Sequence, residues 1–262
     1  STGEVEWKNN TISASRSGIW YNLAYGTATP LSISGNTINY IENEASTRWD
    51  GIWLTSLGGS INPVITGNII TGADPSTKLV SGYHLWNNTT MAADGITIQG
   101  GSVTDVDYGI WINNWDGYPT STGSNAGATK AKIDGITITD ADLAGVYLKD
   151  NSLNTSGASA FVYANLTNST ISGSGSGVLL EGEDASAGVV DNPASITGNQ
   201  FGIVVKDGAD LASVTGNTIT NNTLGGIIIE STAGTIGVIN NNNISGNGYT
   251  FDATHGLGLQ NA

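Results

Sequence analysis

The fold of this chain is decided by two short patterns, and both occur in residues 31–54, LSISGNTINYIENEASTRWDGIWL. In the first pattern, Ile33-Ser34-Gly35-Asn36-Thr37-Ile38, a Gly-Asn pair separates two segments of alternating apolar and polar residues. Gly and Asn tolerate a positive φ, so this pattern predicts a strand, a tight corner and a second strand. The second pattern, Gly51-Ile52-Trp53-Leu54, predicts one further strand, and neither pattern has the apolar spacing of a helix.

Both patterns recur along the chain. Nine copies of glycine, apolar, any, apolar follow one another at intervals of 24 to 36 residues, and they begin at Gly18, Gly51, Gly82, Gly109, Gly145, Gly177, Gly202, Gly226 and Gly256. Fixed strand patterns with loops of variable length are typical of a coil that rises one strand spacing, about 4.8 Å, per revolution. The sequence therefore predicts a parallel β-helix in which equivalent residues of successive coils form columns.

On these two patterns the chain resembles the right-handed parallel β-helix proteins of the pectate-lyase-like superfamily, and the resemblance covers residues 5–259. We therefore expect an all-β protein: a single right-handed parallel β-helix over residues 1–262, with three short strands per coil and about eight to nine coils. The resemblance also implies an internal asparagine ladder at one corner, made of Asn10, Asn36, Asn68, Asn217 and Asn242. Gly101, Ile136 and Ser169 interrupt this column, so the ladder is expected to break in mid-helix.

Composition excludes several classes of function. Lys and Arg number 8 against 22 Asp and Glu, which gives a net charge of −14 that would repel nucleic acids and anionic membrane surfaces. No apolar stretch approaches the length of a membrane span, so membrane insertion is not expected. Cysteine is absent, which excludes thiol catalysis, a Cys-ligated zinc site and disulfides.

The third position of the second pattern points outward, onto the face that forms the substrate cleft in enzymes of this superfamily. It holds an aromatic stripe, Trp20, Trp53, His84, Trp111 and Tyr147, and no acid, Arg or Lys. Trp49, Trp86, Trp115 and Tyr118 are expected to flank this stripe. Neither the Ca²⁺-binding Asp with a basic residue of pectate lyases nor the Asp, His and Arg-x-Lys set of polygalacturonases can be matched. We therefore predict no catalytic residues and no required cofactor. The stripe is a ligand-binding or lateral-contact face, or the chain's own loops cover it.

The next outward column contains Lys149, Glu181, Lys206 and Glu230. Two interpretations are open. Glu181 and Glu230 lie two coils apart, about 9.6 Å by strand spacing, near the upper limit for the carboxyl pair of an inverting glycosidase. The alternative is a column of alternating charges, in which each residue has an opposite charge as its neighbour. This second interpretation also explains the two lysines.

Four aspartates, Asp105, Asp107, Asp140 and Asp142, occupy the turns before two consecutive copies of the second pattern. Carboxylate oxygens are the ligands that Ca²⁺ prefers, so these residues are candidate calcium ligands. Their spacing does not follow a known calcium-binding loop, and solvated acidic turns are the other interpretation.

The two ends suggest a function. Near the N-terminus, Val5, Trp7 and Ile12 lie in the two strands that the first pattern predicts for each coil. Near the C-terminus, Leu257 and Leu259 lie in the strand that the second pattern predicts. Together they would make one complete coil, which predicts that copies stack head to tail. Our main hypothesis is a non-enzymatic extracellular or cell-surface structural protein whose partner is itself. The alternatives are a glycan-binding or polysaccharide-degrading module that uses the aromatic stripe, and a segment of a longer adhesin.

Overall fold

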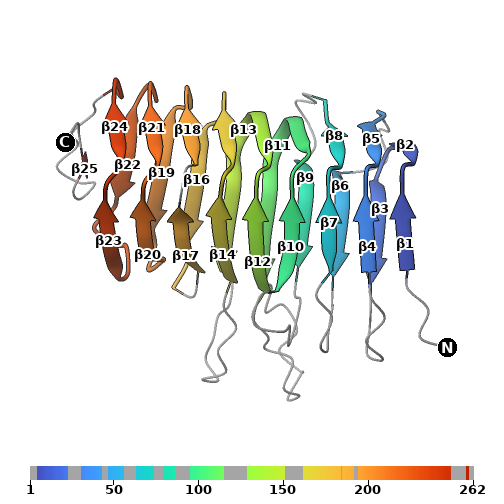
Figure 1. The fold of residues 1–262 in the computed structure, drawn as a ribbon, viewed down its shortest axis with the longest axis horizontal. Coiled ribbons are helices and arrows are strands. Elements are labelled where there is room, and N and C mark those ends of the chain that lie inside the picture. Colours follow the sequence, from blue (N-terminus) through green and yellow to red (C-terminus); the bar gives the residue numbers. More distant parts are fainter. Residues whose placement is uncertain are drawn as a thin grey trace, which may run out of the picture.

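The computed structural model describes residues 5–22, 31–42, 47–55, 63–73, 79–86, 95–114, 129–150, 162–183, 185–191, 194–248 and 258–259. Every regular element in these ranges is a β-strand. The chain winds around one long axis, and strands of successive coils lie side by side (Figure 1). These ranges contain no helix that could cross a membrane. The all-β prediction is confirmed.

The first face of the helix is a parallel sheet of nine strands, one from each coil. In spatial order the strands are β1 (Val5–Lys8), β4 (Leu31–Ser34), β7 (Val64–Thr66), β10 (Ile96–Gln99), β12 (Thr129–Asp134), β14 (Val162–Thr167), β17 (Ala185–Asp191), β20 (Asp210–Thr215) and β23 (Ile236–Asn240).

The second and third faces share one sheet because two long strands, β11 (Ser102–Asn114) and β13 (Thr137–Asp150), bend through both. The other strands of the second face are β2 (Thr11–Ala14), β5 (Thr37–Tyr40), β8 (Ile69–Thr71), β15 (Thr170–Ser172), β18 (Ser195–Thr197), β21 (Thr218–Thr220) and β24 (Asn243–Ser245). Those of the third face are β3 (Ser17–Asn22), β6 (Arg48–Thr55), β9 (Leu79–Trp86), β16 (Ser176–Glu181), β19 (Phe201–Lys206), β22 (Gly225–Ile229) and β25 (Gly258–Leu259).

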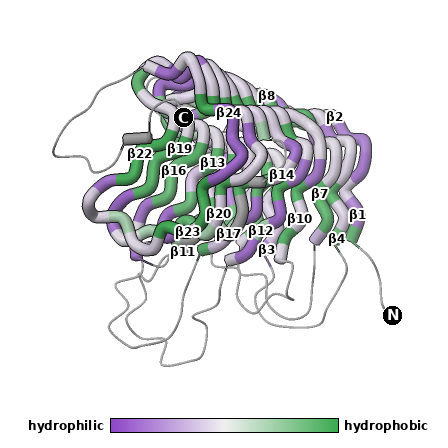
Figure 2. Tube along the Cα trace, turned by 60° about the vertical axis from the view of Figure 1, so that its left-hand side comes forward, coloured by the Kyte–Doolittle hydropathy of each residue, from purple (hydrophilic) through white to green (hydrophobic). Residues whose placement is uncertain are grey.

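Inward-pointing apolar residues of the three faces form the core. Ile33, Ile38 and Ile52 come from three successive strands of one coil, and all three are fully buried. Apolar and polar residues alternate along strands of the first face such as β4 (Figure 2), whereas β19 and β22 on the third face carry apolar residues at successive positions. This period of two places one side chain inside and the next outside, which is why a coil without helices can fill its interior.

The glycine of the second pattern is required by close packing. A Cβ atom on Gly51 would lie 2.6 Å from the carbonyl oxygen of Gly82 and 2.6 Å from Cγ2 of Ile70. Glycine of the first pattern has a different role, because Gly35 takes a φ of 64° at the corner between the first and second faces. Asn9 adopts a φ of 56° at the equivalent corner one coil earlier. Both conformations belong to the left-handed region that Gly and Asn tolerate.

The predicted asparagine ladder is present. The backbone N–H and side-chain amide of Asn10 donate to Oδ1 of Asn36, and those of Asn36 donate to Oδ1 of Asn68. At the other end, Asn217 donates to Asn242 in the same way. Between these segments the column is interrupted as expected, and the hydroxyl of Ser169 there accepts from the backbone N–H of the preceding coil.

A second ladder lies at the corner between the second and third faces. Asn199 donates to Oδ1 of Asn222, and Asn222 donates to Oδ1 of Asn247, in each case through the backbone N–H and the side-chain amide. This ladder was not predicted from the sequence. Its signal was available, because Ile219-Thr220-Asn221-Asn222 and Ile244-Ser245-Gly246-Asn247 repeat the apolar-x-Gly/Asn-Asn corner of the first ladder.

The last strand departs from the predicted arrangement. Among the described strands, all pairings are parallel except that between β22 and β25, where Ile227 pairs with Leu259 and Ile228 with Gly258 in antiparallel register. The pattern Gly256-Leu257-Gly258-Leu259 was expected to continue the parallel third face. That expectation is wrong for the described residues, because a strand of two residues makes too few backbone hydrogen bonds for its local pattern to specify its direction.

Candidate functional site

The outward aromatic stripe forms one continuous column on the third face. Register pairs Trp20 with Trp53, Trp53 with His84, His84 with Trp111, and Trp111 with Tyr147. The rings are stacked along this column, with centroid separations of 5.1, 6.0, 4.5 and 6.4 Å. A parallel sheet without bulges at these positions keeps equivalent side chains one strand spacing apart, so residues 127 positions apart at the two ends belong to one stack.

Arg48 lies within this stack. Its guanidinium carbon is 5.1 Å from the ring centroid of Trp53 and 5.2 Å from that of Trp111. The guanidinium also donates to Oδ2 of Asp50 through Nε at 2.9 Å and Nη2 at 2.8 Å. Arginine is suited to this position because its planar group can stack on rings while its N–H groups bind a carboxylate.

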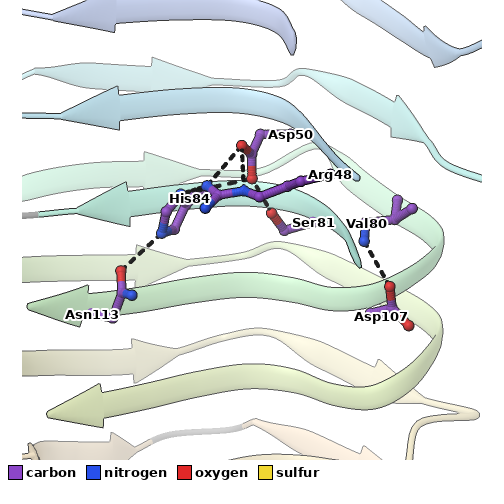
Figure 3. Close-up of polar contacts among 7 residues, drawn as sticks. All are labelled: Arg48, Asp50, Val80, Ser81, His84, Asp107 and Asn113. Carbon is purple, nitrogen blue, oxygen red and sulfur yellow. Dashed lines mark hydrogen bonds and ion pairs between the residues drawn. The ribbon is translucent and has the colours of Figure 1, made fainter. Parts of the chain in front are cut away.

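His84 connects this arginine to the next coil. Nη2 of Arg48 contacts Nδ1 of His84, and Nε2 of His84 lies 2.8 Å from Oδ1 of Asn113 (Figure 3). Arg48 is always a donor, so Nδ1 of His84 accepts and Nε2 donates to Asn113. Burial and then the charge of Arg48 hold the pKa of His84 well below its usual value. The ring is therefore neutral.

Asp50 completes the buried network. Its Oδ1 accepts a hydrogen bond from the hydroxyl of Ser81 and lies 3.7 Å from Nδ1 of His84. Burial raises the pKa of Asp50, while the charge and hydrogen bonds of Arg48 and the hydroxyl of Ser81 oppose this shift. Serine, histidine and aspartate are thus close together, but Ser81 donates to the aspartate and not to the histidine. This geometry lacks the base-to-nucleophile contact of a catalytic triad.

Access to the stripe differs along its length. Trp20 is 56% exposed, whereas His84 is 1% and Tyr147 5% exposed. Trp86 folds against the column, with its ring centroid 6.0 Å from that of Trp53. Trp49 was expected beside the stripe but lies in the core instead, where β6 turns the side chain inward and its ring meets Tyr40 edge-on. The expected flanking residues Trp115 and Tyr118 lie outside the described residues.

The charged column beside the stripe is held by ion pairs. Lys149 and Lys206 contact the two carboxylate oxygens of Glu181 at 2.8 and 3.3 Å, and the hydroxyl of Tyr147 donates to Glu181 at 2.9 Å. Partial burial acts to raise the pKa of Glu181, but these partners outweigh it and lower the pKa. Three members of the column therefore follow the alternating-charge interpretation.

The four expected calcium ligands do not converge. Within the described ranges no group of three or more His, Asp or Glu side chains is placed to hold a metal ion. Asp105 and Asp140 adopt φ values of 54° and 55° at the second corner, a conformation that Asp tolerates better than most residues. Oδ2 of Asp107 instead accepts the backbone N–H of Val80, at 2.6 Å. Asp142 is an exposed residue of β13.

The expected assembly residues lie at both ends of the helix. Val5 and Trp7 belong to β1 and Ile12 to β2, the edge strands at the N-terminal end. Trp7 belongs to the core column of Ile33 yet is 39% exposed. Leu259 lies in β25, and Leu257 lies outside the described residues.

Comparison with known proteins identifies the same architecture. The family model described as the right-handed β-helix region matches residues 122–261, just over half of the chain. No curated protein and no solved structure gives a significant match. The parallel coils continue on the N-terminal side of the matched residues, from β1 to β11. This chain belongs to the right-handed β-helix family.

Proposed function

We propose that the protein is a non-enzymatic structural unit, outside the cell or on its surface, that extends end to end with further copies of itself. The observation that carries this proposal is the polarity of the first asparagine ladder. Asn10, Asn36 and Asn217 each donate through the backbone N–H to Oδ1 of an asparagine in the next coil, so the donors point toward the C-terminal end and the accepting oxygens toward the N-terminal end. The two ends of such a ladder are complementary.

Asn10 and Asn242 are the terminal members. Among the described residues, no group donates to Oδ1 of Asn10, and the backbone N–H of Asn242 has no acceptor. A copy that places its Asn10 on the Asn242 of another copy would form the same pair of hydrogen bonds as inside the ladder. Unpaired edge groups are a strong template for pairing with another chain.

The apolar and charged columns are compatible with this arrangement. If the register continues by one coil, Trp7 of the second copy lies next to Ile239 of the first copy in the same core column, and Ile12 lies next to Ile244. Glu6 and Lys8 would then face Val238 and Asn240, which carry no charge. Repulsion from the net charge of −14 is screened beyond about 10 Å at moderate salt. Burial of the half-exposed Trp7 would favour the contact.

Electron microscopy and sedimentation velocity of the purified protein test this function. We expect unbranched filaments with an axial repeat of about 43 Å, because nine strand spacings of about 4.8 Å make up one copy. The Asn10→Ala variant should stay folded but assemble poorly. Asn39→Ala, at an outward position of β5, is the matched control and should assemble normally. A protein that sediments as a monomer at all concentrations would exclude the proposal.

Glycan binding at the open end of the aromatic stripe is the second candidate function. It is favoured by Trp20, whose exposed ring lies parallel to Trp53 within 14° and so offers a flat apolar surface. Affinity electrophoresis with neutral and acidic polysaccharides would measure it. We expect the retardation to be lost in Trp20→Ala and kept in Leu143→Ala, a variant of another exposed apolar residue.

A further inference from the structure

The direction of β25 carries an inference about how a second copy docks. The other two strands of the last coil, β23 and β24, are parallel to their neighbours and present edges that match β1 and β2. β25 occupies the third face of this coil but runs in the opposite direction. The counterpart at the N-terminal end, β3, pairs in parallel with β6. At the contact between two copies, the strand on one of the three faces therefore runs in the opposite direction.

The sequence of this segment is suited to both directions. In the eight preceding copies of the pattern, the strands of the third face pair in parallel, and by that register Leu257 would pair with Ile227, Gly258 with Ile228, and Leu259 with Ile229. In the antiparallel register, Gly258 again pairs with Ile228, and Leu259 takes the position opposite Ile227. Leu-Gly-Leu reads the same in both directions, so reversal about Gly258 exchanges two identical residues.

The residue at the centre of this segment makes the reversal accessible. Every earlier copy has an aromatic or branched apolar residue, or histidine, at the third position of the pattern, where this copy has Gly258. Glycine weakens a strand because it loses more backbone freedom on folding than other residues and has no side chain to pack. It also lacks a side chain that would distinguish the two faces of the strand. The antiparallel pairing is thus short and weakly specified.

We propose that β25 is a reversible strand: it is antiparallel in the isolated protein and turns parallel when β3 of a second copy docks beside it. The inference rests on the end-to-end function proposed above. In the antiparallel state only the first and second faces of the last coil match the incoming copy. In the parallel state all three faces continue, and a heterologous contact of this kind repeats without closing. Reversal of β25 therefore controls whether the filament grows.

Engineered disulfides can hold each state, because the chain has no cysteine of its own. The pair Ile227→Cys and Leu259→Cys matches the antiparallel register, and Ile229→Cys and Leu259→Cys matches the parallel register. The two variants differ by a single position, so each is the control for the other. Both are studied oxidised and reduced, by light scattering for growth and by microscopy for filaments. Mass spectrometry of the oxidised forms verifies that each bond has closed.

We expect the oxidised antiparallel variant to lose filament growth and to regain it on reduction. The oxidised parallel variant should grow with a shorter lag than its reduced form. Equal growth of both oxidised variants, with filaments present, would overturn the reversal while leaving the end-to-end function intact. Absence of filaments from the intact protein and from all four forms would instead overturn the end-to-end function, and the reversal with it.

Discussion

The backbone N–H and the side-chain amide of Asn36 both donate to Oδ1 of Asn68 in the next coil, at 3.0 and 2.9 Å. Both residues are fully buried. One oxygen therefore satisfies two donors that water cannot reach, and the amide of Asn68 in turn donates to the carbonyl of Ile33. This relationship secures the corner between the first and second faces from one coil to the next.

Replacing Asn68 by Ala should destabilise the protein more than an average surface change. The substitution leaves the buried backbone N–H of Asn36 and one N–H of its side-chain amide without an acceptor, while the other N–H of that amide still donates to the carbonyl of Trp7. Each unsatisfied group costs about 1–3 kcal/mol. We expect a loss of about 3 kcal/mol in the free energy of unfolding, measured by urea denaturation. Asn39→Ala, in the same coil as Asn36 but outward, is the control and should change stability by no more than about 0.5 kcal/mol.

Gly51→Ala tests the close approach of backbone and side chain at the start of the third face. The added Cβ would meet the carbonyl of Gly82 and the side chain of Ile70. Overpacking of this kind typically costs about 1–3 kcal/mol. Gly67→Asn is the contrast: a Cβ there meets nothing within 4 Å, and Asn168 already adopts the required positive φ at an equivalent corner. Equal melting temperatures for the two variants would contradict the packing argument.

Acid should destabilise the protein through His84. In the folded state the pKa of His84 is held well below its usual value, so the unfolded chain binds a proton that the folded chain does not. The stability present at neutral pH is therefore lost as the pH falls below about 6.5, the ordinary histidine value. The measurement is the melting temperature between pH 7.5 and 5.

His84→Gln supplies the control for this pH dependence. Glutamine can accept from Arg48 and donate to Asn113 but does not titrate. The variant should therefore lose less stability than the parent protein over the same pH interval. A parallel fall in both melting curves would show that His84 is not the titrating group.

Acidic glycans should not be degraded. Incubation with pectin, polygalacturonate or alginate, with and without added Ca²⁺, is expected to release neither unsaturated products nor reducing ends. The physical reason is that the carboxylate of Glu181 is engaged by Lys149, Lys206 and Tyr147 and is ionised, so it is a poor general acid. Turnover that disappears in Glu181→Gln would overturn this prediction.

Much of the architecture was predictable because its signals are local. The alternation from Ile33 to Ile38 and the Gly-Asn corner between these residues involve near neighbours in the sequence of one coil. Because the pattern repeats every 24 to 36 residues, equivalent residues of successive coils form a column. The stacking of Trp20, Trp53 and His84 followed from the same register. The second asparagine ladder was equally local and was overlooked.

Other features depended on groups that meet only in the folded chain. Arg48 reaches His84 across 36 residues, and no spacing in the sequence indicates that its guanidinium lies between two tryptophans. Trp49 turns into the core because β6 begins before the glycine of its pattern and already follows the register of β9, where it pairs with Val80.

By itself, the sequence determined that this chain coils in parallel and which side chains of the two repeated patterns stack inside, because strand period and corner conformation are properties of neighbouring residues. Only the tertiary structure decided the direction of β25 and the partners of Arg48, Asp50 and Glu181. A strand of two residues can satisfy its backbone in either direction, and a charged side chain pairs with whichever opposite charge the packed coils bring within reach. Those choices are made by pairing across coils, which no local pattern encodes.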